Sequence, residues 1–192
     1  FAGGGAGAQP GARPCHDPGQ VREIHAAGHE VASHSHRHEW LPGLDPHALR
    51  ATLRDSKDAL EACIQAPVRA FVPPFNQPFD LPRKLAFSRS ERSEVPRGRV
   101  GIPRLCHELD RAGYRFCRLT YVGALDRLRG PHRPTRPSRI SGVQCLRVNT
   151  GGGFGSTALE VVRRCSERGG TVVTYGHPHS LGAGNSQDRS LL

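Results

Sequence analysis

The sequence contains no methionine, only two lysines and no long hydrophobic run. Apolar residues make up 36% of its 192 residues. No apolar stretch approaches the roughly 20 residues that a membrane-spanning helix requires, which argues against such a helix. Because the chain begins with Phe1 rather than with methionine, we expect a fragment or a processed form. No signal peptide is visible in it, and the compartment is left open.

Other absences exclude further classes of protein. Glycine (23) and proline (16) are frequent but follow no period, which excludes collagen-like repeats. None of the six cysteines lies in a Cys-x-x-Cys pair, so zinc-ribbon and dithiol redox motifs are absent. We expect the cysteines to fill apolar core positions, and disulfide pairing is left open.

The formal net charge is +10, and arginine supplies nearly all of the positive charge. Arginine is concentrated in residues 83–99 and 127–139, where it alternates with proline and serine. These segments lack the aromatic residues on which nucleic-acid bases stack, so they are expected to be loops or insertions. A polyanion-binding or nucleic-acid-binding function therefore remains only an alternative.

Apolar periodicity and turn residues predict alternating helices and short strands within a single domain over residues 1–192. Such alternation is typical of an α/β protein with a mainly parallel sheet, whose functional groups lie at the carboxyl ends of the strands. The segments that follow Ser33, Val72 and Tyr175 are therefore expected to meet. Helices are predicted over 18–27, 46–65, 102–112 and 157–167, and strands over 30–33, 68–72, 114–121, 143–148 and 171–175.

Histidines are unevenly distributed, and several fall within residues 28–38. His34 and His38 are four residues apart, so on a helical turn both rings would face one side. Two imidazoles so placed can bind one ion at about 2.0–2.1 Å. Two alternatives stay open: the run could be a solvated histidine-rich patch, or His36 could pair with His38 in an extended conformation.

Three segments, in the same order, resemble motifs of the polysaccharide deacetylases, the NodB-homology family of carbohydrate esterases. Residues 28–38 match the family's G-H-E-(apolar)-x-x-H-(S/T)-x-x-H segment, including Gly28, His34 and His38. Residues 71–76 (FVPPFN) are similar to its F-R-P-P-Y-G segment. Residues 171–179 (TVVTYGHPH) are similar to its last strand, which ends in a catalytic histidine.

The resemblance implies a distorted (β/α) barrel, here incomplete, and hydrolysis of an N-acetyl or O-acetyl group on a carbohydrate. His34 and His38 would bind a divalent ion, expected to be Zn²⁺, with Ser35 fixing the turn. The leaving amine would be protonated by His177, or alternatively by His179. The backbone N–H of Phe75 would be an oxyanion donor. Substrate-binding residues would be Pro73, Pro74 and Trp40, although Trp40 could equally pack beside the motif.

The sequence also departs from the family pattern. The family's first strand carries an Asp pair that supplies a base and a metal ligand, and residues 1–20 contain only Asp17. We expect that strand to lie upstream of Phe1; otherwise Asp17, Glu30 or Glu39 would have to serve. Val72 replaces the usual arginine. A catalytically inactive deacetylase-like fragment or binding module is therefore the main alternative to a hydrolase.

Overall fold

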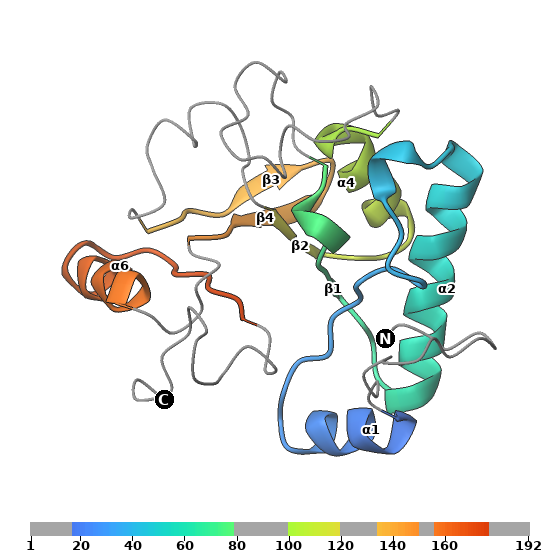
Figure 1. Ribbon diagram of the computed structural model, residues 1–192, viewed down its shortest axis with the longest axis horizontal. Helices are drawn as coiled ribbons and strands as arrows, with labels where there is room; N and C mark the ends of the chain where they lie inside the picture. Colours follow the sequence, from blue (N-terminus) through green and yellow to red (C-terminus); the bar gives the residue numbers. More distant parts are fainter. Residues whose placement is uncertain (1–16, 79–99, 120–133, 150–155, 177–192) are drawn as a thin grey trace, which may run out of the picture.

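The computed structural model describes residues 17–78, 100–119, 134–149 and 156–176. Figure 1 shows a small sheet near the middle of the molecule, with the two N-terminal helices along one side and the C-terminal helix on the other. The fold is mixed α/β, as predicted from the alternation of elements.

The described residues contain no helix with both the length and the apolar character needed to cross a membrane.

Helix α1 (Pro18–Ala26) begins at a reciprocal cap that the sequence encodes locally. The Asp17 carboxylate accepts a hydrogen bond from the backbone N–H of Gln20 (2.9 Å), and the Gln20 side chain accepts one from the backbone N–H of Asp17 (3.0 Å). These bonds satisfy backbone donors that a helix end otherwise leaves unpaired. Val21 is buried on the helix, which packs against the next helix.

Helix α2 (Pro46–Ile64) is the longest described helix. Asp45 caps it by accepting hydrogen bonds from the backbone N–H groups of His47 (2.8 Å) and Ala48 (2.9 Å), and Pro46 occupies the first helical position. The predicted helix over 46–65 is thus confirmed to within a residue. Apolar side chains at helical spacing form its buried face: Leu49, Leu53, Leu60 and Ile64.

The sheet has four strands in the order β1-β2-β4-β3. Strands β1 (Ala70–Phe71), β2 (Phe116–Leu119) and β4 (Val143–Arg147) run parallel, and only β3 (Ser138–Ile140) is antiparallel to its neighbour. The expectation of a mainly parallel sheet is therefore confirmed. Closure into a distorted barrel stays a prediction.

Residues 30–33 were expected to form a strand, but only Ser33 pairs with the sheet, through an isolated parallel bridge to Phe71. The backbone N–H of Ser33 donates to the carbonyl of Ala70 (2.9 Å), and the backbone N–H of Val72 donates to the carbonyl of Ser33 (2.8 Å). This short contact brings the start of the histidine segment to the carboxyl end of β1.

Strand β3 corrects the expectation that residues 127–139 are loop throughout, because it takes in Ser138 and Arg139. A two-residue turn joins it to β4, with positive φ at Ser141 (45°) and Gly142 (86°), as tight hairpins require. Helix α4 (Ile102–Arg111) packs against this hairpin. A Cβ atom at position 142 would lie 2.6 Å from Asp110 Oδ1, so both conformation and space favour glycine there.

The last predicted strand, over 171–175, is reduced to isolated pairing. Thr171 forms an antiparallel bridge with Thr135, and Val173 is held by Asn149. The backbone N–H of Asn149 donates to the Val173 carbonyl (2.8 Å), and the Val173 N–H donates to Asn149 Oδ1 (2.9 Å). A side chain thus completes pairing that a longer strand would make through its backbone.

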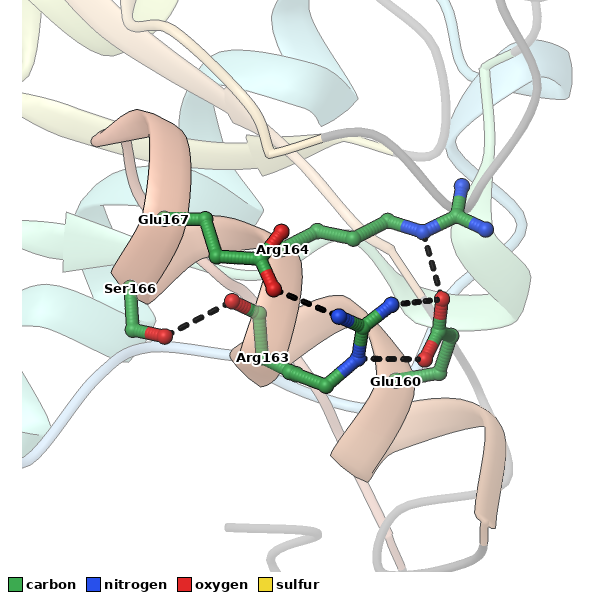
Figure 2. A network of polar contacts seen from close by, with 5 residues as sticks. All are labelled: Glu160, Arg163, Arg164, Ser166 and Glu167. Atoms are coloured by element: carbon green, nitrogen blue, oxygen red, sulfur yellow. Dashed lines mark hydrogen bonds and ion pairs between the residues drawn. The ribbon is translucent and has the colours of Figure 1, made fainter.

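Helix α6 (Ser156–Arg168) lies on the opposite side of the molecule from α1 and α2 and carries a surface ion-pair network (Figures 1 and 2). The Glu160 carboxylate accepts hydrogen bonds from Arg163 (3.1 Å) and Arg164 (2.6 Å), which lower its pKa to about 2. These side chains lie at the surface and remain in contact with solvent, so the network contributes little to folding.

Three of the five described cysteines have the core role expected of them. Cys106, Cys117 and Cys145 are buried, whereas Cys63 and Cys165 are only partly covered, and none of these five forms a disulfide. The core joins one face of α2, one face of α4 and the sheet. Its fully buried large side chains include Leu41, Leu49, Leu53, Val68, Phe71, Ile102, Leu105, Leu109, Tyr114 and Val143.

Leu49→Ala tests this core. Leu49 is fully buried, so the substitution should lower the free energy of unfolding by about 2–5 kcal/mol through lost burial and a residual cavity. Leu159→Ala on α6 is the matched control, because that side chain is 51% exposed and its loss should change stability little. Urea unfolding measures both, and equal losses would contradict the packing described.

Candidate functional site

His34 leaves the sheet beside β1 and is oriented by a backbone carbonyl. Its Nδ1 lies 2.6 Å from the carbonyl oxygen of Val72. A carbonyl can only accept a hydrogen bond, so Nδ1 carries the proton and donates it. In the neutral ring, this leaves the Nε2 lone pair available, which is the arrangement found in histidines that bind metal ions.

The rings of His34 and His38 lie next to each other, with centroids 4.9 Å apart and planes at 66°. The segment is not the helical turn that their spacing suggested, because Ser35 (φ 65°) and His38 (φ 58°) are left-handed. The buried Ser35 stabilises this loop by accepting a hydrogen bond from the backbone N–H of Glu39 at 3.1 Å. The prediction that the rings of His34 and His38 lie side by side is confirmed. The prediction that a helical turn brings them together is wrong.

His36 does not join them through an extended conformation. Its backbone N–H donates to the buried Thr52 hydroxyl on α2 at 3.0 Å, which ties the histidine loop to that helix. A second hydrogen bond to α2 joins the hydroxyl groups of Ser33 and Ser56, whose Oγ atoms lie 2.7 Å apart. The loop is therefore anchored to both β1 and α2.

The surroundings of His34 favour its neutral form. Partial burial lowers the pKa of the imidazole, and the positive charges of His38 and Arg118 lower it further. The hydrogen bond to Val72 opposes this shift without cancelling it. A neutral imidazole is the form that can bind a metal ion.

Aromatic rings cover one side of this pair. Phe75 lies in the turn η2 (Pro74–Asn76), is 53% exposed, and stacks edge-on against His38 with ring centroids 4.5 Å apart. Trp40 also packs against Phe75, at 5.5 Å between ring centroids. Pro73 and Pro74 are buried, so their visible contribution is to shape the turn that presents Phe75.

Three residues that the motif comparison did not single out as functional lie in this turn or beside it. Arg118 on β2 donates a hydrogen bond to Asn76 Oδ1, and Asn76 Nδ2 donates to the hydroxyl of Tyr175 at 3.1 Å. The Arg118 guanidinium also lies 4.9 Å from the centre of the Tyr175 ring. Arg118 is one of two arginines in the predicted strand over 114–121, so the sequence offered no signal that set it apart from Arg115.

The carboxylates considered as substitutes for a missing base lie elsewhere or are already engaged. Asp17 caps α1, and Glu30 is exposed. Burial would raise the pKa of Glu39, but hydrogen bonds from Ser35 and from the backbone of Arg37 outweigh it and lower the pKa. No set of three metal-binding side chains occurs within the described ranges. His177 and His179 lie outside the described residues.

The donor set therefore fits a metal ion in part. His34 and His38 supply two adjacent imidazoles, one of them already oriented for binding through Nε2. A stable protein site needs three or four ligands, and the described residues supply two of them. The remaining ligands would have to come from other parts of the protein or from water.

The sequence of residues 3–86 matches the family model of polysaccharide deacetylases. This part of the chain is therefore similar to the polysaccharide deacetylases. The matched stretch contains both histidines, Trp40 and the turn that carries Phe75. No curated protein matches the sequence.

Solved structures show the same relationship at the level of the fold. A candidate polysaccharide deacetylase from Mycobacterium smegmatis is similar with a TM-score of 0.54 and 15% identity, over 83% of this chain and 53% of that one. The chain thus spans about half the length of that protein. This similarity supports a deacetylase-like fold and no finer statement.

Two further similarities are weaker. A GH57-type branching enzyme from Pyrococcus horikoshii has a TM-score of 0.48 and 21% identity, over 71% of this chain and 24% of that one. A CE4 family pseudoenzyme from Bacillus anthracis has a TM-score of 0.39 and 16% identity, over 83% and 40%. Neither is close enough to support an argument about this chain.

The lowered pKa of His34 predicts a pH-dependent stability of the metal-free protein. Its ordinary pKa is 6.5, so between that value and the lower folded-state pKa the unfolded chain binds more protons. The stabilising contribution is therefore full above pH 6.5 and declines as the pH falls below it. Urea unfolding across this range should show a smaller decline for His34→Gln than for the parent, whereas exposed His47→Gln should match the parent. Equal declines in all three would refute the environment described for His34.

Proposed function

We propose that the chain is part of a metal-dependent hydrolase that removes N-acetyl or O-acetyl groups from a carbohydrate. The observation that carries this proposal is the pairing of His34 and His38 at the end of β1, with His34 Nδ1 bound to the Val72 carbonyl. It lies within the stretch that matches the family model of polysaccharide deacetylases. Because the chain spans only part of its structural relative, the activity is proposed for the whole protein.

In this proposal, His34 and His38 hold a divalent ion, with Zn²⁺ the best match to imidazole ligands. Such an ion, when bound, polarises the acetyl carbonyl and lowers the pKa of a bound water towards about 7. The Val72 carbonyl fixes the ring orientation of His34 and so prepares Nε2 for binding. The described residues supply no general base, which the proposal therefore places elsewhere in the protein.

The turn beside the histidines is proposed to receive the acetylated sugar. The backbone N–H of Phe75 would donate to the oxygen that becomes negative during hydrolysis. The partly exposed Phe75 and Trp40 rings offer an apolar surface to the sugar, while Pro73 and Pro74 shape the turn. His177 is the proposed acid that protonates the leaving amine, with His179 as its alternative.

Metal content is the first test. Elemental mass spectrometry of the protein at equilibrium with excess zinc should find about one Zn²⁺ per chain above the buffer, since mass action fills even a site in which two imidazoles are completed by water. The double variant His34→Ala/His38→Ala should lose it. His47→Ala/His107→Ala, which removes two exposed histidines, is the matched control and should keep it.

The other outcomes separate the alternatives. Zinc retained by His34→Ala/His38→Ala would contradict the proposed site. Zinc bound at this site without release of acetate from acetylated oligosaccharides, even in a longer protein, would indicate a binding module. Affinity for polyanions that falls steeply with salt and ignores both histidines would instead indicate a basic polyanion binder.

A further inference from the structure

The turn that carries Phe75 has an unusual backbone. Phe75 (φ 55°) and Asn76 (φ 57°) are consecutive non-glycine residues in the left-handed region. Asparagine tolerates this region, but for a bulky residue such as phenylalanine it is uncommon and disfavoured. Such a conformation persists only where surrounding contacts hold it. The contacts of Asn76 show what holds this turn.

Asn76 uses both ends of its amide. Its Oδ1 accepts a hydrogen bond from the Arg118 guanidinium, and its Nδ2 donates to the Tyr175 hydroxyl at 3.1 Å. The Arg118 guanidinium lies 4.9 Å from the centre of the Tyr175 ring, so the three side chains form a closed cluster. It joins the turn η2, strand β2 and the segment that leads into His177.

The consequence reaches the histidines through Phe75. With Asn76 held, the Phe75 ring stays in contact with both His38, at 4.5 Å, and Trp40, at 5.5 Å. We propose that Arg118 is a positioning residue, which clamps Asn76 and Tyr175 and thereby keeps Phe75 over His38 and Trp40. This inference rests on the proposed function only in treating the turn as part of the active site.

The side-chain chemistry requires arginine in particular. A planar guanidinium can donate to an amide oxygen while it stacks on an aromatic ring, whereas an ammonium group is a compact, strongly hydrated charge. The Arg118 guanidinium is partly desolvated by burial, which lowers its pKa. Its contacts with Asn76 and Tyr175 are therefore less weakened by water than those of an exposed arginine. Arg118→Lys should therefore restore the clamp incompletely.

Trp40 provides a direct readout, because it is the only tryptophan in the chain and contacts Phe75. Acrylamide quenching of its fluorescence should increase in Arg118→Met, approaching the value for Phe75→Ala, in which the covering ring is absent. Arg118→Lys should fall between Arg118→Met and the parent. Arg115→Met is the matched control, since this exposed arginine precedes the same strand and pairs with Asp110, and its quenching should equal the parent's.

Asn76→Ala provides a second test of the clamp in case Arg118→Met does not fold. It removes the other half of the clamp from the turn itself and should increase quenching in the same way, with circular dichroism confirming the fold. Parent-like quenching in folded Arg118→Met, or in folded Asn76→Ala, would overturn the inference. An equal increase in Arg115→Met would also overturn it, because the effect would then not belong to the clamp.

Zinc content separates this inference from the proposed function. Arg118→Met should keep the zinc stoichiometry of the parent, because His34, His38 and the Val72 carbonyl are unchanged. If the parent binds no zinc, the metal proposal fails, yet the quenching series still decides the role of Arg118. Loss of zinc in folded Arg118→Met with parent-like quenching would overturn the positioning role and point to a direct electrostatic effect on the histidines.

Discussion

The hydrogen bond from His34 Nδ1 to the carbonyl of Val72 fixes the geometry on which the candidate site depends. It is the third of three successive contacts, after the bonds of Ser33 to Ala70 and of Val72 to Ser33. Together they hold a segment that is too short to form a strand against the end of β1. Without them, neither the orientation of His34 nor the placement of His38 beside it would be defined.

Two loops that each contain residues in the left-handed backbone region meet at this site, through the contact of His38 with Phe75. The histidine loop, with Ser35 and His38 at positive φ, is anchored through Thr52 to α2. The Phe75 turn is anchored through Asn76 to β2 and to the last described segment. Loops hold functional groups in a defined geometry only when rigid elements support them. Here helix α2 and strands β1 and β2 provide that support.

The sequence predicted what local chemistry determines. Helices α1 and α2 begin at Asp17 and Asp45, where a capping residue is followed directly by proline, and their positions are nearly those expected. The parallel strands followed from apolar runs separated by helices. These features depend on neighbours along the chain, so the sequence alone could identify them.

Long-range contacts account for what was missed. The spacing of His34 and His38 suggested a helical turn, but bonds to Val72 and Thr52, far along the chain, impose a different loop. Arg118 became significant only when β2 was placed beside the Phe75 turn. The central claim is the Nδ1–H tautomer of His34, which ¹⁵N NMR of the metal-free protein at a pH above 6.5 measures directly. The account predicts a protonated Nδ1 and a bare Nε2 for His34, assigned by their loss in His34→Gln. A proton on Nε2 instead would contradict the hydrogen bond to Val72 and the site built on it.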